Sequence, residues 1–336
     1  MDGPELTRLF RQRRAGQTLQ ADVYVHCPEE ATVRRLSPGN GVYYQPCIRP
    51  DGRKVVYAGA DLGPPRLWEA DVADGTRRPL TPEGSAALHP VYSWDGTRIA
   101  YVSDAAGDAP HVRVAELNTG GRPKRPQVFH VWVCDADGSN PERLTDGRWV
   151  DLRPTFSPDG AHVVFVSNRG RRADRLWRVP VPPAQDAGRA TPASSTTQAY
   201  SEPELLYGDE RVYRPWFSAD GASIFCHTLG DRVQHHPLRI PLNGDPPVRL
   251  APGAFERAHG SFADPDGASV LVHAEHDGIW NIWEIPLEGD APPRVISIPG
   301  FPQAYHATRA RGRLAFDLPR GYSRLRELRR CVRFLR

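Results

Sequence analysis

The sequence lacks a long hydrophobic run, and this absence bears on where the protein lies. No stretch approaches the roughly 18 apolar residues that a membrane-spanning helix needs. The N-terminal residues, MDGPELTRLFRQRRAGQ, lack the apolar core of a secretory signal. These two absences predict a chain with no transmembrane segment, no secretory leader and a cytoplasmic location.

Excess charge and paired cysteines are also scarce. A net charge of +3 on 336 residues is too small to indicate a nucleic-acid partner. The five cysteines are an odd number and form no Cys-x-x-Cys pair. This usage predicts small buried thiols in a reducing compartment rather than a disulfide framework.

Turn-forming residues are abundant by contrast, with 34 prolines and 30 glycines. Six times the chain repeats a unit in which a short strand-like segment ends in an Asp-Gly-type turn and a second strand-like segment follows. Such turns between apolar runs favour β-hairpins, because both turn positions tolerate positive φ. The turn glycines are Gly52, Gly96, Gly160, Gly221, Gly267 and Gly312, at successive spacings of 44, 64, 61, 46 and 45 residues.

This repeat predicts an all-β fold, a six-bladed β-propeller. Four-stranded propeller blades recur at about 40–45 residues. The two longer spacings contain segments rich in Pro, Gly, Ala, Ser and Thr, residues 104–128 and 182–203, which we interpret as inserted loops. A seven-bladed ring is the less favoured alternative.

The two ends of the repeat region complement each other. Residues 21–38 resemble the third and fourth strands of a unit without its first half, and the last unit, from His306, lacks a good second half. Pairing the two would close the ring with N-terminal strands and leave no long exposed edge. We therefore expect one propeller domain over residues 21–320, between a basic extension at 1–20 and a basic amphipathic tail at 321–336. The tail is predicted to dock on the propeller, with an acidic partner or membrane surface as the alternative.

Each unit opens with a polar residue about seven positions before its turn. In a propeller these six positions converge on one mouth of the central channel. The six residues are Gln45, His89, Arg153, Arg214, His259 and His306.

The order of these residues around the closed ring suggests a chemistry. Three histidines and the glutamine are consecutive, and the two arginines face them. Imidazoles with an amide oxygen can hold Mn²⁺ or Zn²⁺, and a pair of guanidiniums suits carboxylates. This predicts a divalent-metal site with a small anionic substrate, whereas a polar lining without metal and an anion or peptide site without metal are the alternatives. The predicted metal ligands are His259, His306, Gln45 and His89, and the predicted substrate-binding residues are Arg153 and Arg214.

The repeated Pro-x-Phe-Ser-Pro-Asp-Gly unit resembles the TolB-like propeller repeat (also called the PD40 or WD40-like repeat) from about residue 21 to residue 318. Residues 34–72, RRLSPGNGVYYQPCIRPDGRKVVYAGADLGPPRLWEADV, resemble the first blade of oligogalacturonate lyases. The segment Phe225–His227 and the isolated His306 are also similar to that family. The sequence departs from the lyases in having no Gln-x-x-His-x-His metal cluster and six units in place of seven.

The resemblance implies a metal-dependent β-elimination on a uronate oligomer, the activity of an oligogalacturonate-lyase-like polysaccharide lyase. A metal bound to the uronate carboxylate would stabilise the enolate-like charge that develops when the adjacent carbon loses its proton. We assign His227 or Tyr44 as the base or acid of this step.

A hypothesis of another class is a non-catalytic TolB-like propeller that binds a peptide, a protein or a small anionic ligand. The missing metal cluster favours this hypothesis, whereas the grouping of histidines opposite arginines favours the enzyme. The expected absence of a secretory signal argues against the periplasmic role of TolB itself.

Overall fold

The computed structural model describes residues 20–61, 63–105, 128–171, 174–183, 201–228, 235–255, 257–264, 266–301 and 304–320. Within these ranges the chain forms 24 β-strands, two short 3-10 helices (Pro28–Glu30 and Arg169–Arg171) and no α-helix. The predicted all-β class is therefore confirmed. Nearly all of the two predicted terminal segments and most of both long loops lie outside the described residues.

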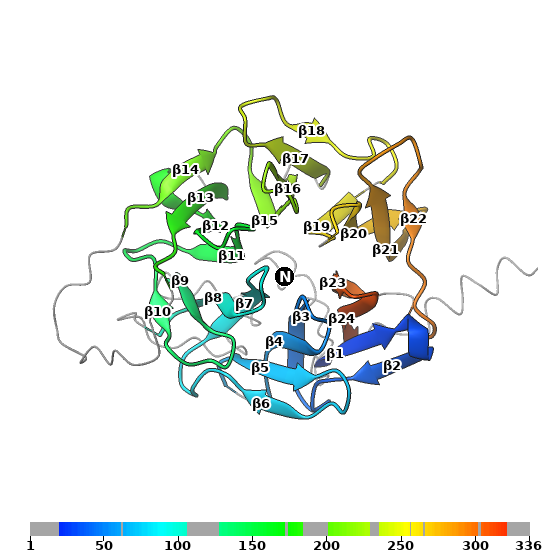
Figure 1. The fold of residues 1–336 in the computed structure, drawn as a ribbon, viewed down its shortest axis with the longest axis horizontal. Helices are drawn as coiled ribbons and strands as arrows, with labels where there is room; N and C mark the ends of the chain where they lie inside the picture. Colours follow the sequence, from blue (N-terminus) through cyan, green and yellow to red (C-terminus); the bar gives the residue numbers. More distant parts are fainter. Residues whose placement is uncertain are drawn as a thin grey trace, which may run out of the picture.

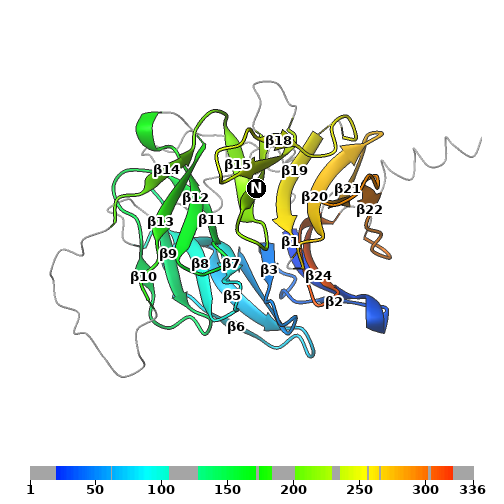
Figure 2. The same cartoon turned by 45° about the horizontal axis from the view of Figure 1, so that its top comes forward.

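The strands form antiparallel units of four that surround a central axis (Figures 1 and 2). The first and last units are joined into one eight-stranded sheet by a short parallel pairing at Ala21↔Val42. In each unit the strand nearest the axis comes first, and here it is called the innermost strand. The first unit contains β3 (Val42–Ile48), β4 (Lys54–Ala60), β5 (Arg66–Asp71) and β6 (Arg77–Pro79). The second unit contains β7 (Ala87–Tyr92), β8 (Arg98–Ser103), β9 (His130–Asp135) and β10 (Glu142–Arg143). The third unit contains β11 (Asp151–Phe156), β12 (His162–Ser167), β13 (Arg175–Pro180) and β14 (Glu204–Tyr207). The fourth unit contains β15 (Val212–Phe217), β16 (Ser223–Thr228), β17 (Pro237–Pro241) and β18 (Val248–Arg249). The fifth is β19 (Arg257–Ala263), β20 (Ser269–His276), β21 (Ile279–Pro286), β22 (Arg294–Val295).

The last unit joins the two ends of the described chain. It contains β23 (Tyr305–Ala310) and β24 (Arg313–Arg320), followed by β1 (Gln20–Cys27) and β2 (Thr32–Arg35) from the N-terminal side. Seven residue pairs connect β1 to β24, from Gln20↔Arg320 to His26↔Leu314. The predicted closure by N-terminal strands is confirmed, and it gives β24 a partner on each side.

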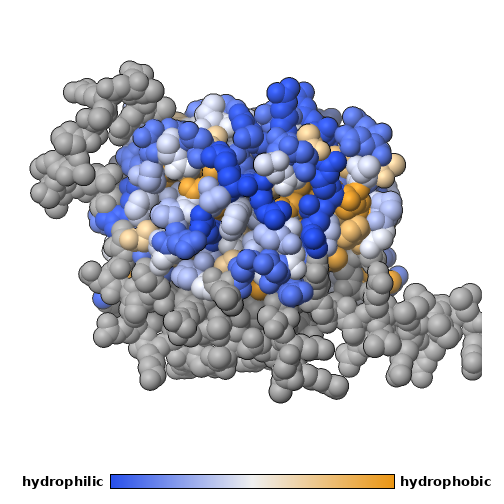
Figure 3. All heavy atoms as spheres, turned by 90° about the horizontal axis from the view of Figure 1, so that it is seen from below, coloured by the Kyte–Doolittle hydropathy of each residue, from blue (hydrophilic) through white to orange (hydrophobic). Residues whose placement is uncertain are grey.

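Apolar side chains from the middle strands fill the spaces between neighbouring units. Val55, Ile99, Phe165 and Ile224 are fully buried, and the core clusters extend from one unit into the next. Four of the five cysteines are buried and free, packed as small apolar residues. In the coloured part of the face in Figure 3, hydrophilic residues predominate and the hydrophobic areas are small and separate.

Every innermost strand is irregular at the same place. Its register with the second strand shifts across two residues, which is a β-bulge. The first residue inside each bulge has positive φ, an uncommon conformation for a residue with a side chain. These residues are Gln45 (57°), His89 (56°), Arg153 (55°), Arg214 (54°), Gly260 (69°) and His306 (47°).

This equivalence corrects one predicted position. The bulge of the fifth unit lies between His259 and Phe262, so Gly260 is the counterpart of the polar residue in the other units. His259 instead corresponds to Tyr44, the residue before the bulge in the first unit. Gly260 lies seven residues before its turn glycine, Gly267, which is the spacing in the first four units, whereas His259 lies eight residues before it. The prediction named the polar residue, His259, although its spacing is one residue too long.

The closing unit should be a major contributor to stability. Phe316 of β24 is fully buried, with its ring 5.7 Å from Tyr24 of β1 and 5.4 Å from Phe301. We expect Phe316→Ala to lower the free energy of unfolding by about 3–5 kcal/mol in urea titrations, because it removes a large core side chain. Val295→Ala, at a residue 44% exposed, is the control and should change the value by less than about 0.5 kcal/mol. Equal effects of the two changes would contradict this role for the closing unit.

Candidate functional site at the channel mouth

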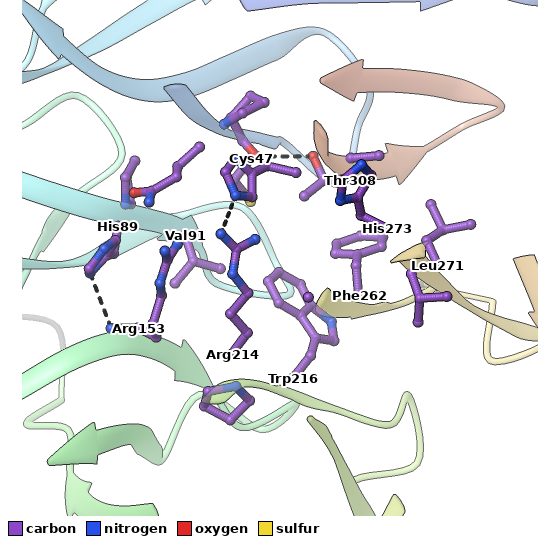
Figure 4. A pocket seen from close by; sticks show the side chains of 18 of the residues that line it. Cys47, His89, Val91, Arg153, Arg214, Trp216, Phe262, Leu271, His273 and Thr308 are labelled. Carbon is purple, nitrogen blue, oxygen red and sulfur yellow. Dashed lines mark hydrogen bonds between the residues drawn. The ribbon is translucent and has the colours of Figure 1, made fainter. Parts of the chain in front are cut away.

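The bulges bring polar side chains from different units to one cavity of about 100 Å³. Four of the five polar bulge residues are followed by proline, which has no N–H to offer to the strand ladder. Figure 4 shows Arg153 and Arg214 reaching into this cavity, with His89 beside Arg153. Five of the six predicted ring residues line the cavity, namely Gln45, His89, Arg153, Arg214 and His306. The side chain of His259 is outside what the structure describes.

A chain of polar contacts crosses the cavity wall at His306. Its Nδ1 lies 2.7 Å from Oδ2 of Asp317 on β24, and its Nε2 contacts Nη2 of Arg214. The backbone N–H of Gln45 donates to the same Asp317 oxygen at 2.6 Å. Because the guanidinium can only donate, Nε2 must accept and Nδ1 must carry the proton. His306 is therefore a neutral imidazole that links a buried carboxylate to a guanidinium.

The protonation states of His306 and Asp317 follow from their burial. Burial, and then the charge of Arg214, holds the pKa of His306 well below its ordinary value. Burial raises the pKa of Asp317 to about 6, against the opposing effect of the Gln45 N–H. Both shifts favour the uncharged form of the group, as expected for a site shielded from water.

A second histidine is held in the opposite tautomer. Nδ1 of His89 accepts the backbone N–H of Arg153 at 3.3 Å, so its proton lies on Nε2 when the ring is neutral. Burial, and then the charge of Arg153, keeps its pKa well below the ordinary value. The Arg153 guanidinium lies 5.3 Å from the centre of the Tyr213 ring, within range of a cation–π contact.

The charge of the cavity wall is one-sided. Among the described lining residues the arginines are cationic and none is an aspartate or glutamate. Asp317 is close, but it lies behind His306 and is not part of the lining. The site can therefore accept an anionic group through charge-assisted hydrogen bonds.

The predicted metal site fits this donor set poorly. Nε2 of His306 faces a guanidinium and its Nδ1 faces Asp317, while Nδ1 of His89 accepts a backbone N–H. A divalent cation needs unprotonated nitrogens and would lie beside Arg214. No cluster of three or more His, Cys, Asp or Glu suited to a metal occurs among the described residues. The metal stays a prediction that this arrangement disfavours.

The residues assigned as base or acid are not at the cavity wall. Neither His227 nor Tyr44 is among the described lining residues. His227 on β16 is 1% exposed, and its Nδ1 accepts the Gly260 N–H at 3.1 Å. Burial raises the pKa of the Tyr44 phenol well above its ordinary value, which disfavours proton release. His227 and Tyr44 thus adjoin the ring residues Gly260 and Gln45 but do not line the cavity.

Several residues of the site were missed by sequence reasoning. Asp317 supports His306 and Gln45, while Trp216 and Phe262 line the cavity with ring centres 4.5 Å apart. An acidic residue inside the apolar run LAFDLP was a usable signal for Asp317. Trp216 and Phe262 lie in the repeat itself, where aromatic residues are equally expected as core.

Comparison with known proteins places the fold. No protein-family model matches the chain. It is 29% identical over 184 residues to a TolB homolog of Chlorobium chlorochromatii, a match covering 48% of this chain and 40% of that protein. It is 36% identical over 115 residues to the Tol-Pal system protein TolB of Anaeromyxobacter dehalogenans, which covers 34% and 22%. The chain thus spans less than half the length of these relatives.

Solved structures agree with this placement. Putative TolB from Agrobacterium tumefaciens has a TM-score of 0.62 at 13% identity, over 90% of this chain and 99% of that one. TolB from Acinetobacter baumannii has a TM-score of 0.54 at 15% identity, over 82% and 65%. An oligogalacturonate lyase in complex with manganese reaches only 0.48 at 14% identity, over 76% and 69%, and carries no argument about the site. The predicted TolB-like β-propeller is confirmed.

The same relatives correct the predicted cytoplasmic location. The matched curated proteins are TolB proteins, several of them named for the Tol-Pal system, and TolB is periplasmic. The expected lack of a secretory signal and of disulfides therefore did not indicate the compartment. No helix among the described residues is long and apolar enough to cross a membrane.

The buried state of His89 predicts a pH dependence of stability. Its pKa is lowered in the folded protein, so below about pH 6.5 the unfolded chain binds a proton that folded His89 does not. As the pH is lowered through this range, the free energy of unfolding should decrease by up to about 1.4 kcal/mol per pH unit because of this group. In urea titrations between about pH 7 and pH 5, the free energy of unfolding of His89→Gln should change less with pH than that of the wild type. His276→Gln, at an exposed histidine, is the matched control, and a slope unchanged in His89→Gln would refute the assignment.

Proposed function

We propose that this TolB-like β-propeller is a non-catalytic binding module whose channel mouth takes a carboxylate group of a peptide or protein partner. The observation that supports this most is the pair of guanidiniums, Arg153 and Arg214, in a cavity wall with no described carboxylate. Two guanidiniums that face one cavity favour an anionic ligand, because their hydrogen bonds to a carboxylate are charge-assisted and can be bidentate.

The contacts of Arg214 support an exchange on binding. Its guanidinium contacts a neutral imidazole nitrogen of His306. A carboxylate accepts hydrogen bonds more strongly than a neutral group and can accept two from one guanidinium. A ligand carboxylate can therefore replace His306 as the partner of Arg214.

The names of the relatives support a protein as the source of that carboxylate. Several matched proteins are named for the Tol-Pal system, an assembly of proteins. The matches cover 22–40% of the length of those relatives, so the partner remains part of the proposal. A binding role also needs no group that withdraws a proton, and neither residue assigned to that task lies at the cavity wall.

A metal-dependent lyase acting on a uronate is the less supported candidate. Arg153 and Arg214 would suit a uronate carboxylate equally well. The enzyme further requires a metal and a base at the mouth, and the histidine tautomers and the positions of His227 and Tyr44 argue against both.

Acidic peptides provide the test. We expect a fluorescein-labelled peptide rich in Glu and Asp to bind the wild type more tightly than its Gln and Asn counterpart in fluorescence anisotropy. Arg153→Gln and Arg214→Gln should each weaken binding by about tenfold or more, because each removes a charge-assisted hydrogen bond. Added salt should weaken binding of the acidic peptide alone.

Arg211→Gln is the matched control, because Arg211 lies outside the cavity and pairs with Asp174 at the surface. It should leave the affinity unchanged. Equal binding of both peptides, or equal losses in all three variants, would refute the carboxylate site. Unsaturated product formed from oligogalacturonate in the presence of Mn²⁺, lost in His306→Ala, would favour the lyase instead.

A further inference from the structure

The fifth unit contributes to the cavity in a way that the other units do not. From the other units, the described lining residues all belong to innermost strands. From the fifth unit, the lining extends to the second and third strands, β20 and β21. These additional residues are Leu271, Val272, His273 and Ile282.

The cause is the residue at the bulge. The other five units carry a polar side chain there, whereas Gly260 carries none. The Arg214 side chain occupies part of the space beside Gly260: a Cβ at position 260 would lie 3.1 Å from Arg214 Nη1 and 3.4 Å from its Cδ. The missing side chain thus allows Arg214 to pass the fifth unit and reach His306 in the sixth.

Apart from His273, the wall of the cavity extension is apolar. Phe262, Leu271, Val272 and Ile282 line it and are each at most 5% exposed. Trp216 of the fourth unit borders the same region, against the ring of Phe262. Figure 4 shows Phe262 and Leu271 on the side of the cavity that lies beyond Trp216 from Arg153. A polar group placed here would lose its hydrogen bonds to water, whereas an apolar group would be favoured.

We propose that Gly260 is the specificity-determining position of the channel mouth, because it opens an apolar subsite beside Arg214 that takes a leucine-sized side chain adjacent to the bound carboxylate. This inference rests on the proposed carboxylate site. The partner segment is then an acidic residue next to an aliphatic one, with the carboxylate on Arg214 and the aliphatic group against Phe262, Leu271 and Ile282. Charge complementarity favours the carboxylate, and burial of apolar surface favours the aliphatic side chain.

The test compares three short peptides that differ at two positions, with Leu-Glu, Ala-Glu or Leu-Gln at the centre. We expect the wild type to bind Leu-Glu about tenfold more tightly than Ala-Glu in calorimetric titrations, because leucine buries additional methylene groups. Gly260→Gln should abolish this preference. Glutamine tolerates this backbone, as Gln45 shows at the equivalent position with a φ of 57°, but its side chain enters the subsite and displaces Arg214.

Gly289→Gln is the matched control. Gly289 also has positive φ (73°), and a Cβ there would meet nothing within 4 Å, so the same substitution tests backbone strain without filling the cavity. This variant should keep the preference for Leu-Glu. If Gly260→Gln does not fold, Gly260→Ala places only a Cβ against Arg214 and should reduce the preference in the same direction.

The outcomes separate the two proposals. Equal affinity for Leu-Glu and Ala-Glu, with Leu-Gln bound weakly, would overturn the apolar subsite and leave the carboxylate site intact. Retention of the full preference in folded Gly260→Gln or Gly260→Ala would overturn the role of Gly260. Failure of every peptide to bind the wild type would overturn the proposed function itself.

Discussion

In each innermost strand one residue is held at a φ between 47° and 69°, and the register with the second strand shifts there. A regular strand would alternate its side chains between the two faces of the sheet. The bulge re-aims one side chain toward the axis of the ring, and repetition brings such side chains together. A left-handed backbone costs roughly 1–2 kcal/mol at a residue with a side chain. The surrounding sheet offsets this cost, which is typical of strained positions at functional sites.

Side chains on neighbouring strands satisfy backbone groups that the bulges free. Asp317 accepts the Gln45 N–H, His89 accepts that of Arg153, and His227 accepts that of Gly260. These contacts determine tautomers as well as positions. A histidine that accepts a backbone N–H through Nδ1 has its proton on Nε2 when neutral, which limits its use as a metal ligand. The backbone geometry thus bears directly on the chemistry of the mouth.

The ring is asymmetric because one unit has no side chain at the bulge. At Gly260 the Arg214 side chain passes toward His306, and the cavity reaches the apolar interior of the fifth unit. The fold alone would not distinguish a lyase from a binding protein, since propellers host unrelated functions. The one-sided charge, the uncharged histidines and the apolar extension together favour a binding site for an acidic and aliphatic segment.

The sequence by itself determined the all-β class, the closure of the ring by N-terminal strands and five of the six residues at the mouth. Asp-Gly turns and alternating apolar runs are local signals, and they repeat often enough to reveal the fold without any contact information. Only the tertiary structure decided that Gly260, and not His259, completes the ring, because the backbone bulge identifies the position and glycine has no polar side chain that would mark it in the sequence. The pairing of His306 with Asp317 and Arg214 joins three strands from two units, 11 and 92 residues apart in the sequence. Which nitrogen carries a proton depends on those long-range contacts, and it is this that turned a predicted metal site into a proposed carboxylate site.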